Sequence, residues 1–98
     1  MKTIWKFPLP KVTPFVAWLP EQAEILCVQT QGDSPCIWAI VDSDATKENR
    51  VFHIVGTGRE VPPGAKQYID TFQKPPSSSE DADQTVYVFH LFENTGMP

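Results

Sequence analysis

The segment Gly56-Thr57-Gly58-Arg59 comes nearest to a ligand-binding motif in this sequence. Two glycines allow positive φ, so successive backbone N–H groups can point into one concavity and hold an anion. The Thr57 hydroxyl and the Arg59 guanidinium would add donors to such a site. The segment lacks the spacing and the helix of a phosphate-binding loop or a dinucleotide-binding fingerprint. It therefore fits either a phosphate contact or a glycine-rich turn that ends a strand.

Three tryptophans are the next residues that could recognise a ligand, because an indole can stack on a nucleobase as well as fill a core. Trp38 stands in an apolar stretch, and we expect it to be buried. Trp5 and Trp18 stand near prolines, and we expect them to be partly exposed or to lie at a subunit contact. Trp5 or Trp38 is the candidate to stack on a base.

Catalytic residues are harder to find. His53 and His90 lie in strand-like stretches, where each could be a general base or a packed, hydrogen-bonded core residue. No paired carboxylates, nucleophile elbow, HExxH or CxxC pattern occurs. The sequence predicts no catalytic residue, no cofactor and no metal site, and leaves Arg50 and His90 as polar ligand contacts. It favours a protein that is not an enzyme, although a triad can assemble in space from distant positions.

The charge balance and the length exclude several classes of protein. The chain has 98 residues, with 8 basic and 12 acidic side chains and a net charge of −4. Three of the acids, Glu80, Asp81 and Asp83, share one loop, so the rest is nearly balanced, and the basic residues form no cluster for duplex nucleic acid. No apolar run approaches the roughly 20 residues of a membrane span. We expect a soluble, intracellular protein that binds neither duplex nucleic acid nor a membrane, on a scaffold smaller than the large enzyme folds.

The chain reads as one all-β domain over residues 1–98. Short stretches rich in Val, Ile, Thr, Phe and Trp are interrupted by Pro, Gly, Asp or Ser. We predict a small antiparallel sandwich or open barrel of about six or seven strands, with at most one short helix. The strands are expected at 3–7, 12–19, 24–31, 36–41, 50–55, 65–73 and 85–93. Residues 65–73 also fit a short helix, and 74–84 form a mobile, acidic Pro/Ser loop.

Several strands can be placed within the sheet. Prolines favour edge positions for the first two strands, and the stretch around Gly32 predicts a hairpin between 24–31 and 36–41. Residues 36–41 are apolar on both faces, which predicts a central strand with cover on each side. A hairpin centred at Gln31-Gly32 would set Cys27 opposite Cys36, but other registers would not. We expect two free thiols, because the chain has no secretory signal.

Several stretches together carry a family resemblance. They are Met1-Lys2-Thr3-Ile4-Trp5-Lys6-Phe7, Ala23 to Gln29, Pro35 to Ala39, Val55 to Gly58, Tyr68 to Gln73 and Val88 to Glu93. They resemble a family of small phage and prophage proteins that is classified as a domain of unknown function. The resemblance implies a bacterial cytoplasm during phage infection and brings no catalytic residues with it.

These features lead to a hypothesis of a homo-oligomeric phage accessory protein that sequesters a nucleotide-derived signalling molecule, without turning it over, against host defence. The predicted ligand contacts are Gly56, Thr57, Gly58, Arg59, Trp5, Trp38, Arg50 and His90. One alternative is a protein–protein inhibitor or structural accessory that docks through a strand edge. Another is a small nuclease or phosphodiesterase that uses His53, His90 and an acid.

Overall fold

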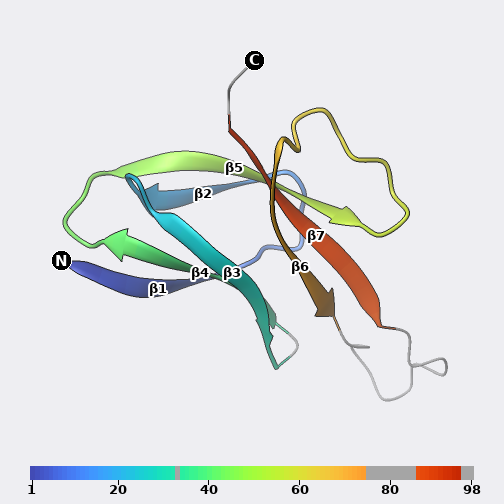
Figure 1. The fold of residues 1–98 in the computed structure, drawn as a ribbon, viewed down its shortest axis with the longest axis horizontal. Helices are drawn as coiled ribbons and strands as arrows, with labels where there is room; N and C mark the ends of the chain where they lie inside the picture. The colour runs from blue at the N-terminus through green and yellow to red at the C-terminus, as the bar shows by residue number, and fades with distance from the viewer. Residues whose placement is uncertain (33, 75–85, 96–98) are drawn as a thin grey trace.

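The chain folds into two antiparallel β-sheets packed face to face. The structure is a computed structural model that describes residues 1–32, 34–74 and 86–95, and none of these residues is helical. The strands are β1 (Lys2–Pro8), β2 (Phe15–Pro20), β3 (Glu24–Gln31), β4 (Ser34–Asp42), β5 (Lys47–Gly56), β6 (Gln67–Lys74) and β7 (Tyr87–Asn94). One sheet has the order β1-β4-β3 and the other β2-β5-β7-β6 (Figure 1). The predicted all-β sandwich is confirmed.

The predicted hairpin is present, with a register that separates the two cysteines. β3 pairs with β4 so that Gln31 lies opposite Ser34, and Gly32 has a φ of 66° at the reversal. Cys27 therefore lies opposite Trp38, and Cys36 lies opposite Gln29. Both cysteines are free.

Other boundaries differ from the prediction in instructive ways. β5 starts at Lys47, earlier than predicted, because its polar first residues pair with Trp18 to Pro20 of β2. Residues 67–74 are a strand, which resolves the choice between strand and helix. Lys74 ends β6, and the rest of the predicted loop at 74–84 lies outside the described residues.

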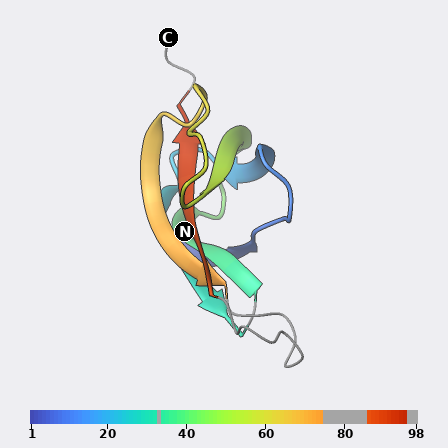
Figure 2. The ribbon, with the colours of Figure 1, turned by 90° about the vertical axis from the view of Figure 1, so that its right-hand side faces the viewer.

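The prediction that β4 is covered on both sides is wrong for the part of the strand that contains Trp38 and Ile40. β4 is the central strand of its sheet, but only its Ile37, Ala39 and Val41 face the other sheet. Its alternate residues lie on the outer face, where Cys36 is buried near the start of the strand and Trp38 and Ile40 are only half-buried, because a two-layer sandwich has no third layer over this face. Figure 2 shows the sandwich from its narrow side.

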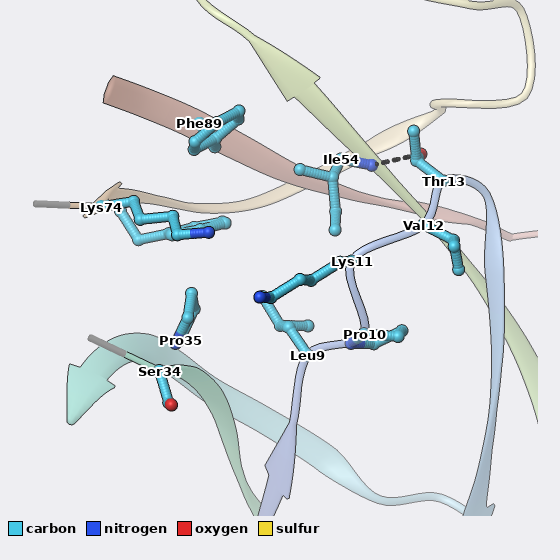
Figure 3. Close-up of a pocket in the computed structure, with 11 residues that line it drawn as sticks. Leu9, Pro10, Lys11, Val12, Thr13, Ser34, Pro35, Ile54, Lys74 and Phe89 are labelled. Carbon is cyan, nitrogen blue, oxygen red and sulfur yellow. Dashed lines mark hydrogen bonds between the residues drawn. The ribbon is translucent and has the colours of Figure 1, made fainter. Parts of the chain in front are cut away.

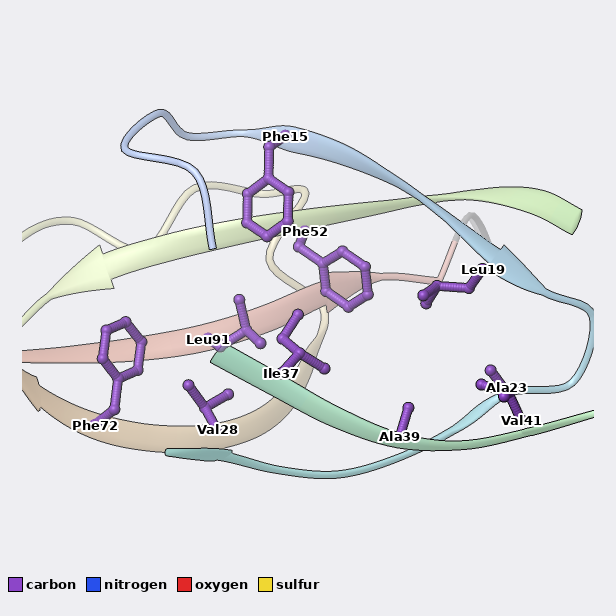
Figure 4. Packing of buried hydrophobic residues seen from close by; sticks show 10 residues of the cluster. All are labelled: Phe15, Leu19, Ala23, Val28, Ile37, Ala39, Val41, Phe52, Phe72 and Leu91. Atoms are coloured by element: carbon purple, nitrogen blue, oxygen red, sulfur yellow. The ribbon is translucent and has the colours of Figure 1, made fainter. Parts of the chain in front are cut away.

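The core fills the space between the two sheets. It consists of Phe15, Leu19, Ala23, Val28, Ile37, Ala39, Val41, Phe52, Phe72 and Leu91 (Figure 4). Phe52 is fully buried near its centre and stacks on Phe15, with 5.4 Å between ring centroids. Burying such side chains stabilises the fold by about 1.5–3 kcal/mol each.

One long side of the sandwich is closed by bonds between the edge strands β3 and β6. The backbone N–H of Val28 donates to Asp70 Oδ2 at 2.8 Å, and the Thr30 hydroxyl donates to the Gln73 carbonyl at 2.7 Å. Each strand carries an irregularity in its pairing, between Ile25 and Cys27 in β3 and between Tyr68 and Asp70 in β6. These bonds satisfy edge groups that would otherwise attract another strand.

Candidate functional site

A pocket opens between the two sheets at one end of the sandwich. Its volume is about 390 Å³, at the lower end of the range for small-molecule sites. It is lined by Leu9, Pro10, Lys11, Val12, Thr13, Ser34, Pro35, Ile54, Phe72, Lys74 and Phe89 (Figure 3). The lining therefore comes from both sheets and from the connection between β1 and β2, and no single stretch of sequence contains it.

The connection between β1 and β2 is tied down at both ends of the pocket. The N–H of Leu9 donates to the Pro35 carbonyl at 3.0 Å, which holds its start against the three-stranded sheet. The N–H of Ile54 donates to the Thr13 hydroxyl at 2.8 Å, which holds its end against the four-stranded sheet (Figure 3). Lys11, between these two anchors, is thereby positioned at the pocket.

The floor of the pocket is apolar and continuous with the core. Phe72 belongs to the core, and its ring stacks on Phe89 with 5.7 Å between centroids. Leu9, Ile54 and Phe89 are partly buried and pack against the core. A flat, apolar group that entered the pocket would meet aromatic and aliphatic carbon on both sides.

Two lysines place positive charge over this apolar floor. The ammonium groups of Lys11 and Lys74 both point into the space bounded by Leu9, Pro35, and Phe89 (Figure 3). Neither lysine has an ion-pair partner among the described residues. Two cations that lie beside low-dielectric walls, with no such partner in the part of the chain that the structure describes, attract an anion more strongly than they would in bulk water.

The predicted glycine turn is formed, but it bonds to its own chain. The N–H of Arg59 donates to the Gly56 carbonyl at 3.0 Å, and the N–H of Thr57 donates to the Val88 carbonyl at 3.1 Å. Gly58 has a φ of 86°, a conformation that favours glycine. Two amides of the expected anion nest, those of Thr57 and Arg59, are therefore used within the fold.

His90 lies next to this turn in a chain of hydroxyl groups. Its Nε2 is 2.9 Å from the Thr57 hydroxyl, and its Nδ1 is 2.8 Å from the Thr71 hydroxyl, which in turn is 2.7 Å from Tyr68 Oη. Thr57 donates to the Val88 carbonyl at 3.2 Å. For neutral His90 we assign the proton to Nε2, because this tautomer gives every hydroxyl one acceptor. Both ring nitrogens are engaged, but the His90 side chain is half-buried and is not part of the core.

The other predicted contacts do not gather at the turn. Trp5 is half-buried and faces the core from β1, whereas Trp38 lies on the outer face of the same sheet. Arg50 points between the sheets, away from solvent. Within one copy of the chain, the structure brings together only His90 and residues 56–59 of the predicted set, and whether these residues bind a ligand stays a prediction.

Arg50 is held by a two-pronged ion pair with Glu93. Its Nε and Nη2 lie 2.6 and 2.7 Å from the two carboxylate oxygens, and its Nη1 donates to the Ala23 carbonyl at 2.6 Å. The side chains are only 17% and 11% exposed. The bond to Glu93 raises the pKa of the Arg50 guanidinium above its ordinary value, although burial acts in the opposite direction. With its donors engaged in this way, Arg50 is placed to stabilise the fold.

His53 is covered by the connection between β5 and β6. It is buried, and a Cβ atom added at Gly64 would lie 2.7 Å from its Nε2. Only a residue without a side chain permits this close approach, so the glycine fixes how the connection crosses the histidine.

The pocket residues were missed by sequence reasoning. Lys11 follows a proline and Lys74 precedes one, in stretches that carry no motif, and the two lysines are far apart in the chain. Leu9 and Phe89 look like ordinary strand or turn residues. The signal for this site lies in the sheet order, which the sequence did not predict.

The fold and the pocket define a class: a two-sheet β-sandwich with a ligand-sized opening at one end. The chain belongs to the family described as Domain of unknown function (DUF7352), whose model matches residues 1–97. The match confirms the prediction that the chain belongs to a family classified as a domain of unknown function. No curated protein and no solved structure matches the chain. Across the described residues, no helix could cross a membrane.

Proposed function

We propose that this protein binds and sequesters a small nucleotide-derived molecule in the end pocket and releases it unchanged. The observation that carries the proposal is that two ammonium groups, those of Lys11 and Lys74, lie over an apolar pocket between the sheets and have no ion-pair partner in the described part of the chain. A nucleotide combines the two properties that such a pocket selects: a flat ring and an anionic phosphate.

The chemistry of the lining assigns each part of the ligand. The base would lie against Phe89 and Ile54, where burial of ring surface favours binding by about 25 cal/mol per Å². The phosphate would bind Lys11 and Lys74 through charge-assisted hydrogen bonds. A volume of about 390 Å³ favours a single nucleotide unit over a larger ligand.

Capture rather than turnover fits the same lining. Among the described residues, the pocket is lined by no histidine, cysteine, aspartate or glutamate. Its titratable groups are two lysines, which supply no pair of groups for acid and base catalysis. The proposal therefore concerns a binding protein.

The setting of this binding is part of the proposal. The resemblance to small phage proteins leads us to propose that the protein acts in the cytoplasm of an infected bacterium. Sequestering a nucleotide signal there would keep the signal from activating a host defence protein. This part rests on analogy and not on the geometry of the site.

Thermal unfolding with a nucleotide panel tests the proposal. The panel contains mononucleotides, cyclic mononucleotides, cyclic dinucleotides and ADP-ribose. An aromatic carboxylate is included to show whether the pocket binds any aromatic anion. A ligand at 100 times its Kd stabilises the folded state by about 2.7 kcal/mol, which raises Tm by roughly 10 °C or more in a domain of this size. Heating the complex should then release intact ligand. A chemically altered product, or no shift with any nucleotide, would contradict the proposal.

A second candidate is a protein–protein inhibitor that docks through the edge strand β2. The observation that favours it is the exposure of Val16 and Trp18, at 56% and 60%. Large apolar side chains at an exposed strand edge are typical anchors for a partner. A pull-down from infected host lysate would return a stoichiometric partner with the natural chain and lose it with Trp18→Ser, whereas a sequestering protein would return none.

A further inference from the structure

The outer face of the three-stranded sheet carries an apolar centre. Ile40 and Trp38 of β4 point away from the other sheet, Ile4 lies opposite Ile40 on β1, and Leu26 lies at the pairing irregularity of β3. Ile4 and Leu26 are 56% and 47% exposed. These four residues are called the outer apolar face below.

Trp38 is the best anchor within the outer apolar face. Its ring is half-buried, and the Lys6 ammonium lies 5.8 Å from the ring centroid while donating to Gln31 Oε1 at 2.8 Å. Tryptophan surrounded by smaller apolar residues and a polar rim is the usual composition of an interface centre. The arrangement therefore fits a protein surface as its occupant.

The two margins of this face carry opposite charges. Lys2 and Lys6 project from the β1 margin, and Glu24 projects from the β3 margin. Ile4 and Glu24 both lie opposite Ile40, one on each side of it. Because Ile4 is midway between Lys2 and Lys6 on β1, Glu24 lies across the sheet from the midpoint between these two lysines. Asp42 of the central strand is already bonded to the Met1 amino group at 2.9 Å.

A face with opposite charges on its two margins complements a second copy of itself. When one copy is turned by a two-fold axis parallel to the strands, its β1 margin lies over the β3 margin of the other copy. Glu24 of each copy then lies between Lys2 and Lys6 of the other, twice in each dimer. Such an isologous contact closes after two copies.

We infer that the protein is a homodimer in solution, joined through its outer apolar face. The pocket opens at the end of the sandwich, between the sheets, and does not use this face. The inference is therefore independent of the proposed ligand, and each copy keeps its own binding site.

Sedimentation velocity with matched variants tests the apolar part of the inference. The natural chain should sediment as a dimer, and Ile4→Lys with Leu26→Lys should raise the dimer dissociation constant by about 100-fold or more. Both side chains are exposed, so circular dichroism should report an unchanged fold. Val16→Lys with Trp18→Lys, on the outer edge of the other sheet, should leave the dimer intact. A monomeric natural chain, or a dimer lost only with the Val16 and Trp18 variant, would overturn the inference.

Charge reversal tests the orientation of the two copies. Glu24→Lys alone sets like charges against Lys2 and Lys6 in both contacts, and Lys2→Glu with Lys6→Glu does the same with Glu24. Each protein should be monomeric by itself, and a mixture of the two should form a one-to-one heterodimer. If either protein alone still dimerises, or if the mixture forms no heterodimer, the proposed arrangement is wrong.

Discussion

Positive charge enters the space between the sheets at two places, and the two are built differently. At one, Arg50 gives its donors to Glu93 and to the Ala23 carbonyl. At the other, Lys11 and Lys74 point over an apolar pocket with no ion-pair partner among the described residues. The first arrangement is complete without a ligand, whereas we propose that an anion completes the second.

The location of each site explains the difference. Arg50 and Glu93 lie on neighbouring strands and are largely removed from water, where an unpaired charge would be very costly. Lys11 and Lys74 stand at the open end of the sandwich, where water can solvate them. A buried cation therefore needs a partner within the chain, whereas a cation that water solvates at the opening is stable without one.

The largest effect is expected when the buried pair is broken. Glu93→Ala leaves Arg50 between the sheets without its carboxylate, which should lower the free energy of unfolding by about 3 kcal/mol, at the low end for buried pairs because both groups retain some exposure. Urea unfolding measures the change. Glu48→Ala removes an exposed carboxylate on the same strand as Arg50 and should cost less than about 0.5 kcal/mol. A loss below 1 kcal/mol for Glu93→Ala would mean that this pair is not structural.

Removal of the pocket lysines should give the opposite result. Lys11→Ala and Lys74→Ala should each weaken nucleotide binding by about tenfold or more, because a hydrogen bond to a charged group contributes about 1.5–3 kcal/mol. The free energy of unfolding without ligand should change by no more than about 0.5 kcal/mol. Isothermal titration calorimetry and urea unfolding measure the two quantities.

Arg59→Ala is the matched control for this prediction, since it removes an exposed cation from the glycine turn. It should leave the affinity nearly unchanged. A large loss of nucleotide affinity with Arg59→Ala, and none with the lysine variants, would mean that the ligand binds at the glycine turn.

A smaller effect is expected when both members of the buried pair are replaced. Arg50→Met with Glu93→Leu removes both charges and keeps similar volume, so the free energy of unfolding should return to within about 1 kcal/mol of the natural chain. Urea unfolding of the single and double variants forms a double-mutant cycle. If the double variant is as unstable as Glu93→Ala, packing rather than charge explains the loss.

Added salt should produce the smallest change, and it should affect the lysine pair and the Arg50–Glu93 pair differently. The lysine pair is open to solvent, so nucleotide affinity should fall several-fold between about 0.05 and 0.3 M salt as screening increases. The cost of Glu93→Ala should stay nearly constant over the same range, because Arg50 and Glu93 are shielded from ions. Equal salt dependence of the two quantities would contradict the comparison.

Much of the fold was predictable because local sequence determines it. The reversal at Gly32 separates two apolar stretches, and the strand Glu24–Gln31 has the predicted bounds. The start of β5 was missed because Lys47 to Asn49 are polar, and they are extended only through pairing with Leu19 and its neighbours on β2. The outer exposure of Trp38 could not be predicted, because apolar residues on both faces also fit a strand covered on each side.

The candidate site was less predictable because it is assembled from distant segments. The glycine turn at residues 56–59 and its contact with His90 are real, but the sequence could not reveal that its amides bond to the chain itself. Arg50 looks like a free cation in the sequence, and its partner Glu93 is 43 residues away. Lys11 and Lys74 meet at one opening only because the order of the strands sets their ends side by side.

Amide chemical-shift mapping by NMR tests the central claim most directly. The labelled protein is titrated with the nucleotide that raises its Tm most, and each backbone signal is followed. We predict that the largest shifts belong to Leu9, Lys11, Ile54 and Phe89, around the open end of the sandwich. Largest shifts at Thr57, Gly58 and His90 instead, with the pocket signals unmoved, would contradict the account.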